Sequence, residues 1–408
     1  MLQRLDLNKL LLWYQCILAF NVTFVFFSDL DRYWAYKGIV SSPLVILLFF
    51  VSASVPLIFL RLHEFKYLSK PLMIWCISYV AFSFLWLGFF TDYNANSQQD
   101  FETRVLSTLL LISLNVIFSK YHIVIKFSQS AILLSLLMHL RNIFLELNQP
   151  RIFGDFNLTG RPSGFYQDVN VAGGAFVIGM IFCLDLVPKK LRLPFILSMG
   201  LGSFLTFSRG AIFCYFLELV LLIYLRKINF KQLVTYCSII VLIIFIGGGV
   251  IAKEYLQEIS MQNTNISERI EWIQDPSSSN ANNDTSRFYI VELGWKLYTK
   301  NPIVGNGLGI TDRWSQPIAT HNMYLDLMVN YGFIGAVILP LLLYAIVRKS
   351  RGEVRITSIL FVTFFATWSF FSHEVLEERF QLTIFSLMAA MTTQSRNNLL
   401  SFSGKGKL

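Results

Sequence analysis

Long apolar runs separated by short polar turns are the dominant pattern along this chain. A run of roughly 17–25 apolar residues is long enough to cross a lipid bilayer as an α-helix. The sequence predicts about twelve such helices, at residues 10–28, 38–60, 71–90, 105–119, 121–139, 170–188, 193–208, 210–226, 232–252, 321–347, 355–372 and 379–395. We therefore expect an all-α, polytopic membrane protein with about twelve transmembrane helices.

The longest polar interruption covers residues 253–320, between the ninth and tenth predicted helices. Its middle, DPSSSNANNDTS at 275–286, is rich in turn-forming residues and predicts a loop. The next stretch, 287–299, has apolar residues at helical spacing, which predicts an amphipathic helix on the outer membrane surface. The predicted organisation is therefore transmembrane helices in 1–252, a long outer loop in 253–320, and further transmembrane helices with a cytoplasmic tail in 321–408.

The composition supports a membrane protein and excludes an ordinary soluble domain. Hydrophobic residues make up 54% of the chain, charged residues only 14%, and the mean hydropathy is +0.55, which is more apolar surface than a soluble domain can bury. The net charge of +9 does not require nucleic acid, because Lys and Arg collect in the cytoplasmic loops of membrane proteins. With a cytoplasmic N-terminus, the even-numbered turns are the basic ones, as at Arg61, Lys189 and Arg348. We expect membrane lipids, and no nucleic acid, as partners.

Some basic residues fall on the opposite, outer side, where membrane orientation does not explain them. The guanidinium of arginine presents a fixed fork of donors that matches phosphate oxygens, so several arginines there would suit a lipid-linked diphosphate. Arg209, in the run LTFSRGA, lies between two short apolar runs, where a charge is costly and usually functional. The alternative is that these arginines bind lipid headgroups. The outer basic residues are Arg151, Arg161, Arg209, Arg269, Arg287, Arg313 and His321.

A histidine at the edge of a predicted membrane helix is a candidate general base. His321 stands beside Asn322, at the start of the tenth apolar run. An imidazole titrates near neutral pH and could take a proton from an acceptor hydroxyl. The alternative is structural, with His321 and Asn322 capping the helix that follows.

A second polar turn, residues 373–379, precedes the last predicted helix. Its residues include His373, Glu374, Glu377 and Glu378. The carboxylates could act as a base or bind a cation, but a solvated turn explains them more simply. No group of residues in the sequence has the spacing of metal ligands, so we expect neither a metal ion nor another cofactor.

Four short segments on the outer side occur in a recognisable order. They are R-x-x-G-F-x-x-D-x-N at Arg161–Asn170, T-F-S-R-G-A at Thr206–Ala211, Arg287 followed by NPIVGNGLG, and His321-Asn322 followed after nine residues by Gly332-Phe333-Ile334-Gly335. Together they resemble the O-antigen ligase and polymerase superfamily, and the last is similar to the H-[NSQ]-x9-G-x-x-[GTY] pattern of the ligases. The chain departs from many members in having Val169, where a proline that would stiffen the turn is frequent.

The resemblance implies a GT-C-like helical membrane fold and a metal-independent glycosyltransferase. Such an enzyme moves a glycan from undecaprenyl diphosphate to a sugar hydroxyl at the periplasmic face of the bacterial inner membrane. By position, Arg209 and Arg287 match the diphosphate-binding arginines of the family, and His321 matches its proposed catalytic base. Further substrate contacts are expected from Arg161, Asn170, Asn322 and Arg313.

Three functions remain open at this point. An O-antigen ligase would transfer the finished glycan to lipid A-core, whereas a polymerase would extend the growing glycan on its lipid carrier. The last segment favours the ligase, although the polymerases share much of the pattern. A secondary transporter is the alternative from another class, but it would show repeat symmetry between its halves and charges near the middle of the membrane.

Overall fold

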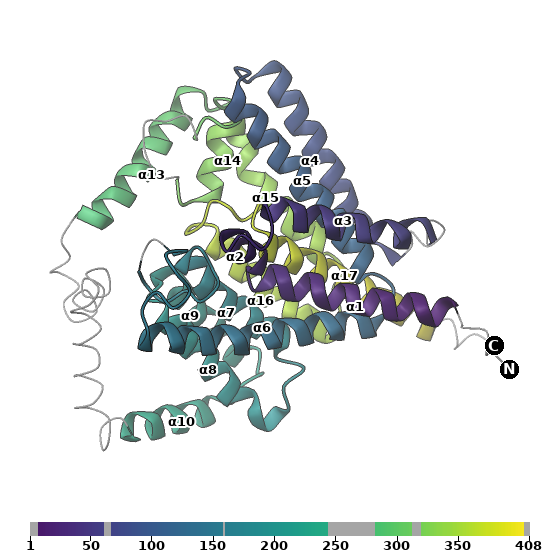
Figure 1. The fold of residues 1–408 in the computed structure, drawn as a ribbon, viewed down its shortest axis with the longest axis vertical. Helices are drawn as coiled ribbons and strands as arrows, with labels where there is room; N and C mark the ends of the chain where they lie inside the picture. The colour runs from purple at the N-terminus through teal and green to yellow at the C-terminus, as the bar shows by residue number, and fades with distance from the viewer. Residues whose placement is uncertain (1–6, 61–66, 158–159, 244–281, 312–319, 404–408) are drawn as a thin grey trace. The chain divides into compact units, whose positions relative to one another are not determined.

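The computed structural model is helical in the part of the chain that it describes, which is residues 7–60, 67–157, 160–243, 282–311 and 320–403 (Figure 1). No strand occurs within these ranges. Several helical segments, five in the described residues, are long and apolar enough to cross a membrane, namely Asn8–Phe27, Lys70–Phe89, Ala95–Phe118, His122–Asn148 and Met323–Val347. The expected all-α class is confirmed for the described residues, and the candidate spans are consistent with a polytopic membrane protein.

Each predicted apolar run contains a helix wherever the structure describes it. The run 232–252 is helical as far as Ile243, and its remainder lies outside the described residues. The apolar helices Pro43–Phe59 and Val169–Cys183 are shorter than a full membrane span, so the number of transmembrane helices stays a prediction. The helices are α1 (Leu7–Phe27), α3 (Pro43–Leu60), α4 (Lys70–Phe89), α5 (Ala95–Phe118), α6 (His122–Asn148), α7 (Val169–Cys183), α8 (Arg192–Leu205), α9 (Arg209–Tyr224), α10 (Phe230–Ile243), α14 (Met323–Tyr331), α15 (Gly335–Val347), α16 (Gly352–Trp368) and α17 (Arg379–Ser403).

Two further helices lie outside those runs. The short α2 (Leu30–Tyr36) follows α1 closely, and the hydrophobic pattern does not predict it. α13 (Asn282–Lys300) covers the stretch in which the pattern predicts an amphipathic helix; its place on a membrane surface stays a prediction. Residues 253–281, the first part of the predicted outer loop, lie outside the described residues.

Large apolar side chains are exposed on the outside of several helices. Phe49 on α3, Phe89 on α4 and Val220 on α9 expose 64%, 76% and 61% of their surface. A soluble monomer rarely exposes such apolar area, whereas a helix that faces lipid has no reason to hide it. The outer surfaces of these helices therefore fit contact with a bilayer.

The chain forms two compact units, which are described separately. The first unit comprises residues 1–132 and 282–408, and the second comprises residues 133–281. In the first unit α5 packs against α3, α4 and α17, and α17 also contacts α1, α15 and α16. Trp368 stacks on Phe364 in its core. In the second unit every residue of α7 except Asn170 is buried, and the helix packs against α8 and α9.

Side-chain caps fix where four of the helices begin. A cap accepts a hydrogen bond from a backbone N–H that the first turn leaves without a partner, and its loss typically costs about 1 kcal/mol. Asp168 accepts from the N–H of Asn170 at 2.7 Å and so starts α7 with Val169, not proline, as its first residue. The caps are Asn94 for α5, Asp168 for α7, Ser208 for α9 and Asn322 for α14.

The tenth predicted helix is interrupted in its middle. α14 ends at Tyr331, a single 3₁₀ turn covers Gly332–Ile334, and α15 begins at Gly335. Gly332 has φ +69° and ψ −156°, a conformation that only glycine adopts readily. The apolar periodicity continues across this point, which is why the sequence pattern alone predicts one unbroken helix.

The glycine-rich loop 301–309 packs against this interruption. The N–H of Phe333 donates to Pro302 O at 2.8 Å, and the N–H of Asn306 donates to Val329 O at 2.8 Å. A Cβ atom on Gly332 would collide with the backbone of Ile303. The loop and the break in the helix belong to two of the four outer segments singled out in the sequence, and the structure shows that they pack together.

Replacing Gly332 with alanine should therefore destabilise the protein. Gly332→Ala adds a collision with the Ile303 backbone to a strained backbone conformation, and we expect it to cost at least about 1 kcal/mol. Thermal unfolding of the purified protein in detergent measures the change. The matched control is Gly88→Ala on α4, where a Cβ meets nothing within 4 Å and alanine favours the helix. Equal melting temperatures for the two variants would contradict this account.

Candidate functional site

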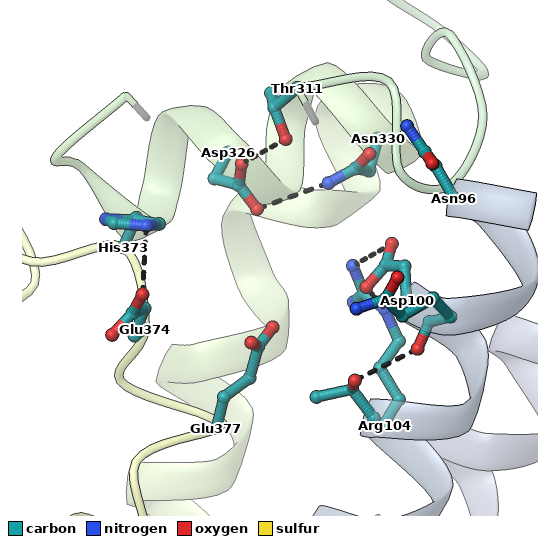
Figure 2. Close-up of a pocket in the computed structure, with 11 residues that line it drawn as sticks. Asn96, Asp100, Arg104, Thr311, Asp326, Asn330, His373, Glu374 and Glu377 are labelled. Carbon is teal, nitrogen blue, oxygen red and sulfur yellow. Dashed lines mark hydrogen bonds and ion pairs between the residues drawn. The ribbon is translucent and has the colours of Figure 1, made fainter. Parts of the chain in front are cut away.

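The first unit contains a cavity of about 360 Å³ with polar walls (Figure 2). The start of α5, the region around α14 and the turn before α17 supply the lining. Four of the lining residues are carboxylic acids and one is an arginine, so we call it the acidic cavity. It is lined by Asn96, Gln99, Asp100, Thr103, Arg104, Thr311, Asp326, Asn330, His373, Glu374 and Glu377.

A buried ion pair forms one wall of the acidic cavity. Arg104 donates from Nε to Asp100 Oδ1 at 2.8 Å and from Nη2 to Asp100 Oδ2 at 2.9 Å. The guanidinium also donates to the Tyr79 hydroxyl and lies 5.1 Å from the centre of the Tyr331 ring. Asp100 accepts a further hydrogen bond from the N–H of Gly309 at 2.8 Å. The pair therefore joins α5 to the glycine-rich loop.

Asp326 forms the opposite wall with two neighbours that hold its carboxylate. Thr311 donates its hydroxyl to Oδ1 at 3.0 Å, and Asn330 donates its amide nitrogen to Oδ2 at 3.2 Å. Figure 2 shows the three side chains above the cavity, with Glu377 facing them from below. Asn330 is 1% exposed, and its carbonyl oxygen Oδ1 has no hydrogen-bond partner among the described residues.

His373 lines the cavity and lies beside His321. Its Nε2 lies 3.5 Å from Glu374 Oε1, and its ring lies 5.6 Å from the ring of His321, at 84° to it. Burial lowers the pKa of His373 to about 4, against the opposing effect of Glu378, so His373 is neutral at neutral pH. Burial, and next the neighbouring Glu378, raise the pKa of Glu374.

The turn that carries these residues is tied to α2 by two ion pairs. Arg32 lies 2.8 Å from Glu378, and Arg379 lies 2.6 Å from Asp31. Burial of Glu378 would raise its pKa, but Arg32 and its other partners outweigh burial, so the pKa lies below its ordinary value. The expectation of a solvated turn is therefore wrong, because α2, which the sequence pattern does not predict, covers the turn and pairs its charges.

His321 and Asn322 lie directly before α14. The backbone of His321 is in the left-handed region, with φ +51°, and its side chain is half-buried. Asn322 caps α14, with Oδ1 accepting from the N–H of Leu325 at 3.1 Å. The side-chain oxygen of Asn322 therefore has a structural role as the cap of α14. A contact between Asn322 and the substrate stays a prediction.

The second unit brings two of the predicted segments together. Arg161 is buried and donates from Nη1 to Phe207 O at 3.1 Å. Asn170 accepts at Oδ1 from the Ser208 hydroxyl at 3.0 Å. Arg209 follows as the first residue of α9 and is half-buried. The Arg161–Asn170 segment thus holds the turn that presents Arg209.

One buried and one half-buried side chain support this arrangement. Glu146 accepts hydrogen bonds from the N–H groups of Ser163 and Gly164, at 2.9 and 2.8 Å. His139 stacks on Phe176 with 4.4 Å between ring centres. Both lie on α6 and fix the path of the chain through the Arg161–Asn170 segment.

The predicted site residues are divided between the two units. His321, Asn322 and the backbone of Arg287 on α13 belong to the first unit, whereas Arg161, Asn170 and Arg209 belong to the second. The Arg287 side chain and the whole of Arg313 lie outside what the structure describes. A single site that combines all seven therefore stays a prediction. In the described ranges no group of three His, Cys, Asp or Glu side chains is arranged to hold a metal ion.

Comparison of the sequence with models of known protein families gives a match, which supports an enzyme over a transporter. Residues 193–340 match the family model described as O-antigen ligase. The chain carries an O-antigen ligase domain. The matched stretch runs from α8 into α15 and includes Arg209, Arg287 and His321, but not Arg161 or Asn170. No curated protein matches the chain significantly.

The resemblance to the O-antigen ligase superfamily is thus confirmed, and it carries general consequences. The O-antigen ligase domain belongs to a family of glycosyl-transfer enzymes, of ligase or polymerase type, that act on lipid-linked glycans. This agrees with the apolar helices of the structure. The transporter alternative has no support from the comparison.

The acidic cavity includes residues that the sequence analysis missed. Arg104, Asp326 and Asn330 are polar residues in or beside apolar runs, and a charge in such a run is an informative signal. Arg104 lies within α5 rather than in a turn, so the charges of the outer turns do not point to it. Asp326 and Asn330 are one helical turn apart on α14, so both face the same side.

Proposed function

We propose that this protein is an O-antigen ligase that transfers a glycan from undecaprenyl diphosphate to a sugar hydroxyl of lipid A-core. It would do so at the periplasmic face of the bacterial inner membrane, as a multi-pass protein with a GT-C-like arrangement of about twelve transmembrane helices. The family match over residues 193–340 carries the proposal, because it includes both candidate diphosphate-binding arginines and the candidate base.

Arg209 is the donor-side residue with the best local support. It begins α9, a helix of 16 residues, and the N-terminus of a helix favours anions through its dipole and its free N–H groups. In the proposal Arg209 and Arg287 bind the diphosphate and stabilise the charge that develops as it leaves. They supply the positive charge that a metal ion provides in other phosphate chemistry, so the proposed reaction is metal-independent.

His321 acts in the proposal as the general base. The acceptor hydroxyl attacks the anomeric carbon of the donor sugar, and its proton passes to the imidazole. The bond between that carbon and the phosphate oxygen breaks, and its electron pair leaves with undecaprenyl diphosphate. The half-buried His321 lies at the start of α14 beside a second imidazole, that of His373, which supports a role in proton transfer.

The choice between ligase and polymerase is tested in a deletion strain. If the protein is the ligase, the strain should lose the ladder of long-chain lipopolysaccharide and accumulate long glycans on the lipid carrier. Gel analysis of lipopolysaccharide, together with extraction of the lipid-linked pool, measures both. Single repeat units on the carrier and on lipid A-core would instead identify the polymerase.

Removal of either arginine should abolish transfer. Arg209→Ala and Arg287→Ala each remove charge stabilisation at the departing diphosphate, a loss that typically costs about 10²–10³ in rate. Lysine at either position should restore only part of the rate, because it keeps the charge but not the planar fork. The matched control for Arg209→Ala is Arg226→Ala, which removes an arginine just beyond the other end of α9 and should leave transfer unchanged. If well-expressed Arg209→Ala and Arg287→Ala proteins transferred glycan at the wild-type rate, the two arginines would not bind the diphosphate and would be explained as contacts with lipid headgroups.

His321→Gln should lose turnover and keep donor binding. Glutamine retains hydrogen bonding without comparable basicity, and a general base contributes about 10²–10⁴-fold. Purified protein, a lipid-linked donor and its acceptor allow product formation and donor affinity to be measured separately. The control is His122→Gln, at the exposed first residue of α6. Normal product formation by His321→Gln would exclude a general-base role for His321. Loss of donor affinity would instead indicate that His321 helps to bind the diphosphate.

A further inference from the structure

We propose that His373 is a positioning residue for His321, and that it holds the His321 imidazole in the orientation from which that ring takes the proton of the acceptor hydroxyl. This inference deepens the proposed function and rests on it, because it takes His321 as the general base. It gives a role in the reaction to the turn before α17, which belongs to none of the four outer segments singled out in the sequence.

The chain that leads into this turn is hydrogen-bonded to the start of α14. The N–H of Met323 donates to Ser369 O at 2.8 Å and to Ser372 O at 3.1 Å. Met323 is 2% exposed, and a hydrogen bond that is shielded from water is electrostatically stronger than one in water. Ser372 directly precedes His373, and Met323 follows His321 by two residues. The main chain itself therefore brings the two histidines together.

A side chain on α14 joins the same two segments a second time. The Tyr324 hydroxyl donates to Ala366 O on α16 at 3.1 Å, and the Tyr324 ring lies 4.9 Å from the ring of Phe370. The end of α16 and the residues after it are thus fixed against the start of α14. The position of His373 relative to His321 therefore does not depend on the contact between their rings alone.

The two histidine rings meet edge to face. Their centres are 5.6 Å apart and their planes are at 84°, an arrangement that aromatic pairs favour. The second side-chain torsion of a histidine has only a broad, roughly two-fold preference, so the rotamer of His321 does not by itself fix the direction of its ring nitrogens. The neighbouring ring of His373 restricts that rotation.

His373 is held in turn by a line of polar contacts that ends on α2. Its Nε2 lies 3.5 Å from Glu374 Oε1 (Figure 2). The Glu374 side chain is hydrogen-bonded to that of Glu378, and Glu378 Oε1 accepts from Arg32 Nη1 at 2.8 Å. Separation of this last pair would leave the Glu378 carboxylate, whose side chain is 3% exposed, as a buried charge without a partner, which is strongly unfavourable. The line therefore anchors His373 to α2.

His373 and Glu374 are both neutral at neutral pH. Burial lowers the pKa of His373 to about 4. An ionised carboxylate has no proton to donate, so the hydrogen bond between Glu374 and Glu378 requires a proton on one of them. Burial, and next Glu378, raise the pKa of Glu374, whereas the pKa of Glu378 lies below its ordinary value, so Glu374 carries the proton. The imidazolium that forms at His321 thus has a neutral neighbour in His373, and a positive charge there would oppose the transfer.

Turnover by variants of His373 tests the proposal. Purified protein with a lipid-linked donor and its acceptor gives kcat and donor affinity separately. We expect His373→Ala to lower kcat by about 10–10²-fold, since a misplacement of about 1 Å can cost about 10²-fold, and to leave donor affinity unchanged. His373→Phe should restore most of kcat, because it keeps a flat, neutral ring and lacks only the nitrogens. The matched control is Ser372→Ala, which keeps the carbonyl that binds Met323 and should have the wild-type kcat.

A second measurement needs no transfer. The chain has five histidines, so ¹³C labelling at Cε1 gives few NMR signals, and the His321 signal is the one that His321→Gln removes. We expect one sharp His321 signal in the wild type and in His373→Phe. The signal should be broadened or split in His373→Ala, where the His321 ring samples several orientations. If the alanine variant does not fold, His373→Leu takes its place, because leucine fills the space without a flat ring.

Each measurement has an outcome that overturns the proposal. A wild-type kcat in His373→Ala, or an unchanged His321 signal, would show that His373 does not position His321. A His373→Phe protein as slow as His373→Ala would show that a ring nitrogen of His373 takes part in the reaction, which is not a positioning role. Normal product formation by His321→Gln would overturn the proposed base instead, while the NMR comparison would still decide whether His373 orders the His321 ring.

Discussion

The ion pair between Arg104 and Asp100 is the interaction on which the described site most depends. A guanidinium buried in a membrane helix is tolerable only if its charge and its donors are satisfied, and Asp100, Tyr79 and Tyr331 meet this requirement together. The same carboxylate also receives the N–H of Gly309. A single buried pair therefore fixes α5, one wall of the acidic cavity and the end of the glycine-rich loop. Loss of one partner would leave an unpaired charge, a change that typically costs about 3–5 kcal/mol.

The sequence predicts much of the fold because membrane helices are long, uninterrupted apolar runs that can be recognised from sequence alone. Each predicted run contains a helix where the structure describes it. The break at Gly332 was not predictable in the same way, because apolar periodicity continues across it and only a packing partner, the loop at Ile303, requires it. The turn before α17 was misjudged for a similar reason. Its charges look solvated until α2 brings Arg32 and Asp31 against them.

The sequence indicates which types of residue form the candidate site, but not which of them contact one another. The motif residues of the second unit are joined by direct hydrogen bonds, Arg161 to Phe207 and Asn170 to Ser208, which explains why those segments occur together. The acidic cavity has no comparable sequence signature, since Asp326 and Asp100 are distant in sequence and meet only in the folded first unit.

The left-handed backbone of His321 limits which amino acids can occupy that position. Outside glycine, the residues that most readily accept such a φ value are asparagine, aspartate and histidine, and β-branched side chains are strongly disfavoured there. Among these, only histidine gains and loses a proton near neutral pH. A residue that served as a general base at this position would have to tolerate the left-handed backbone and to titrate near neutral pH, and histidine does both.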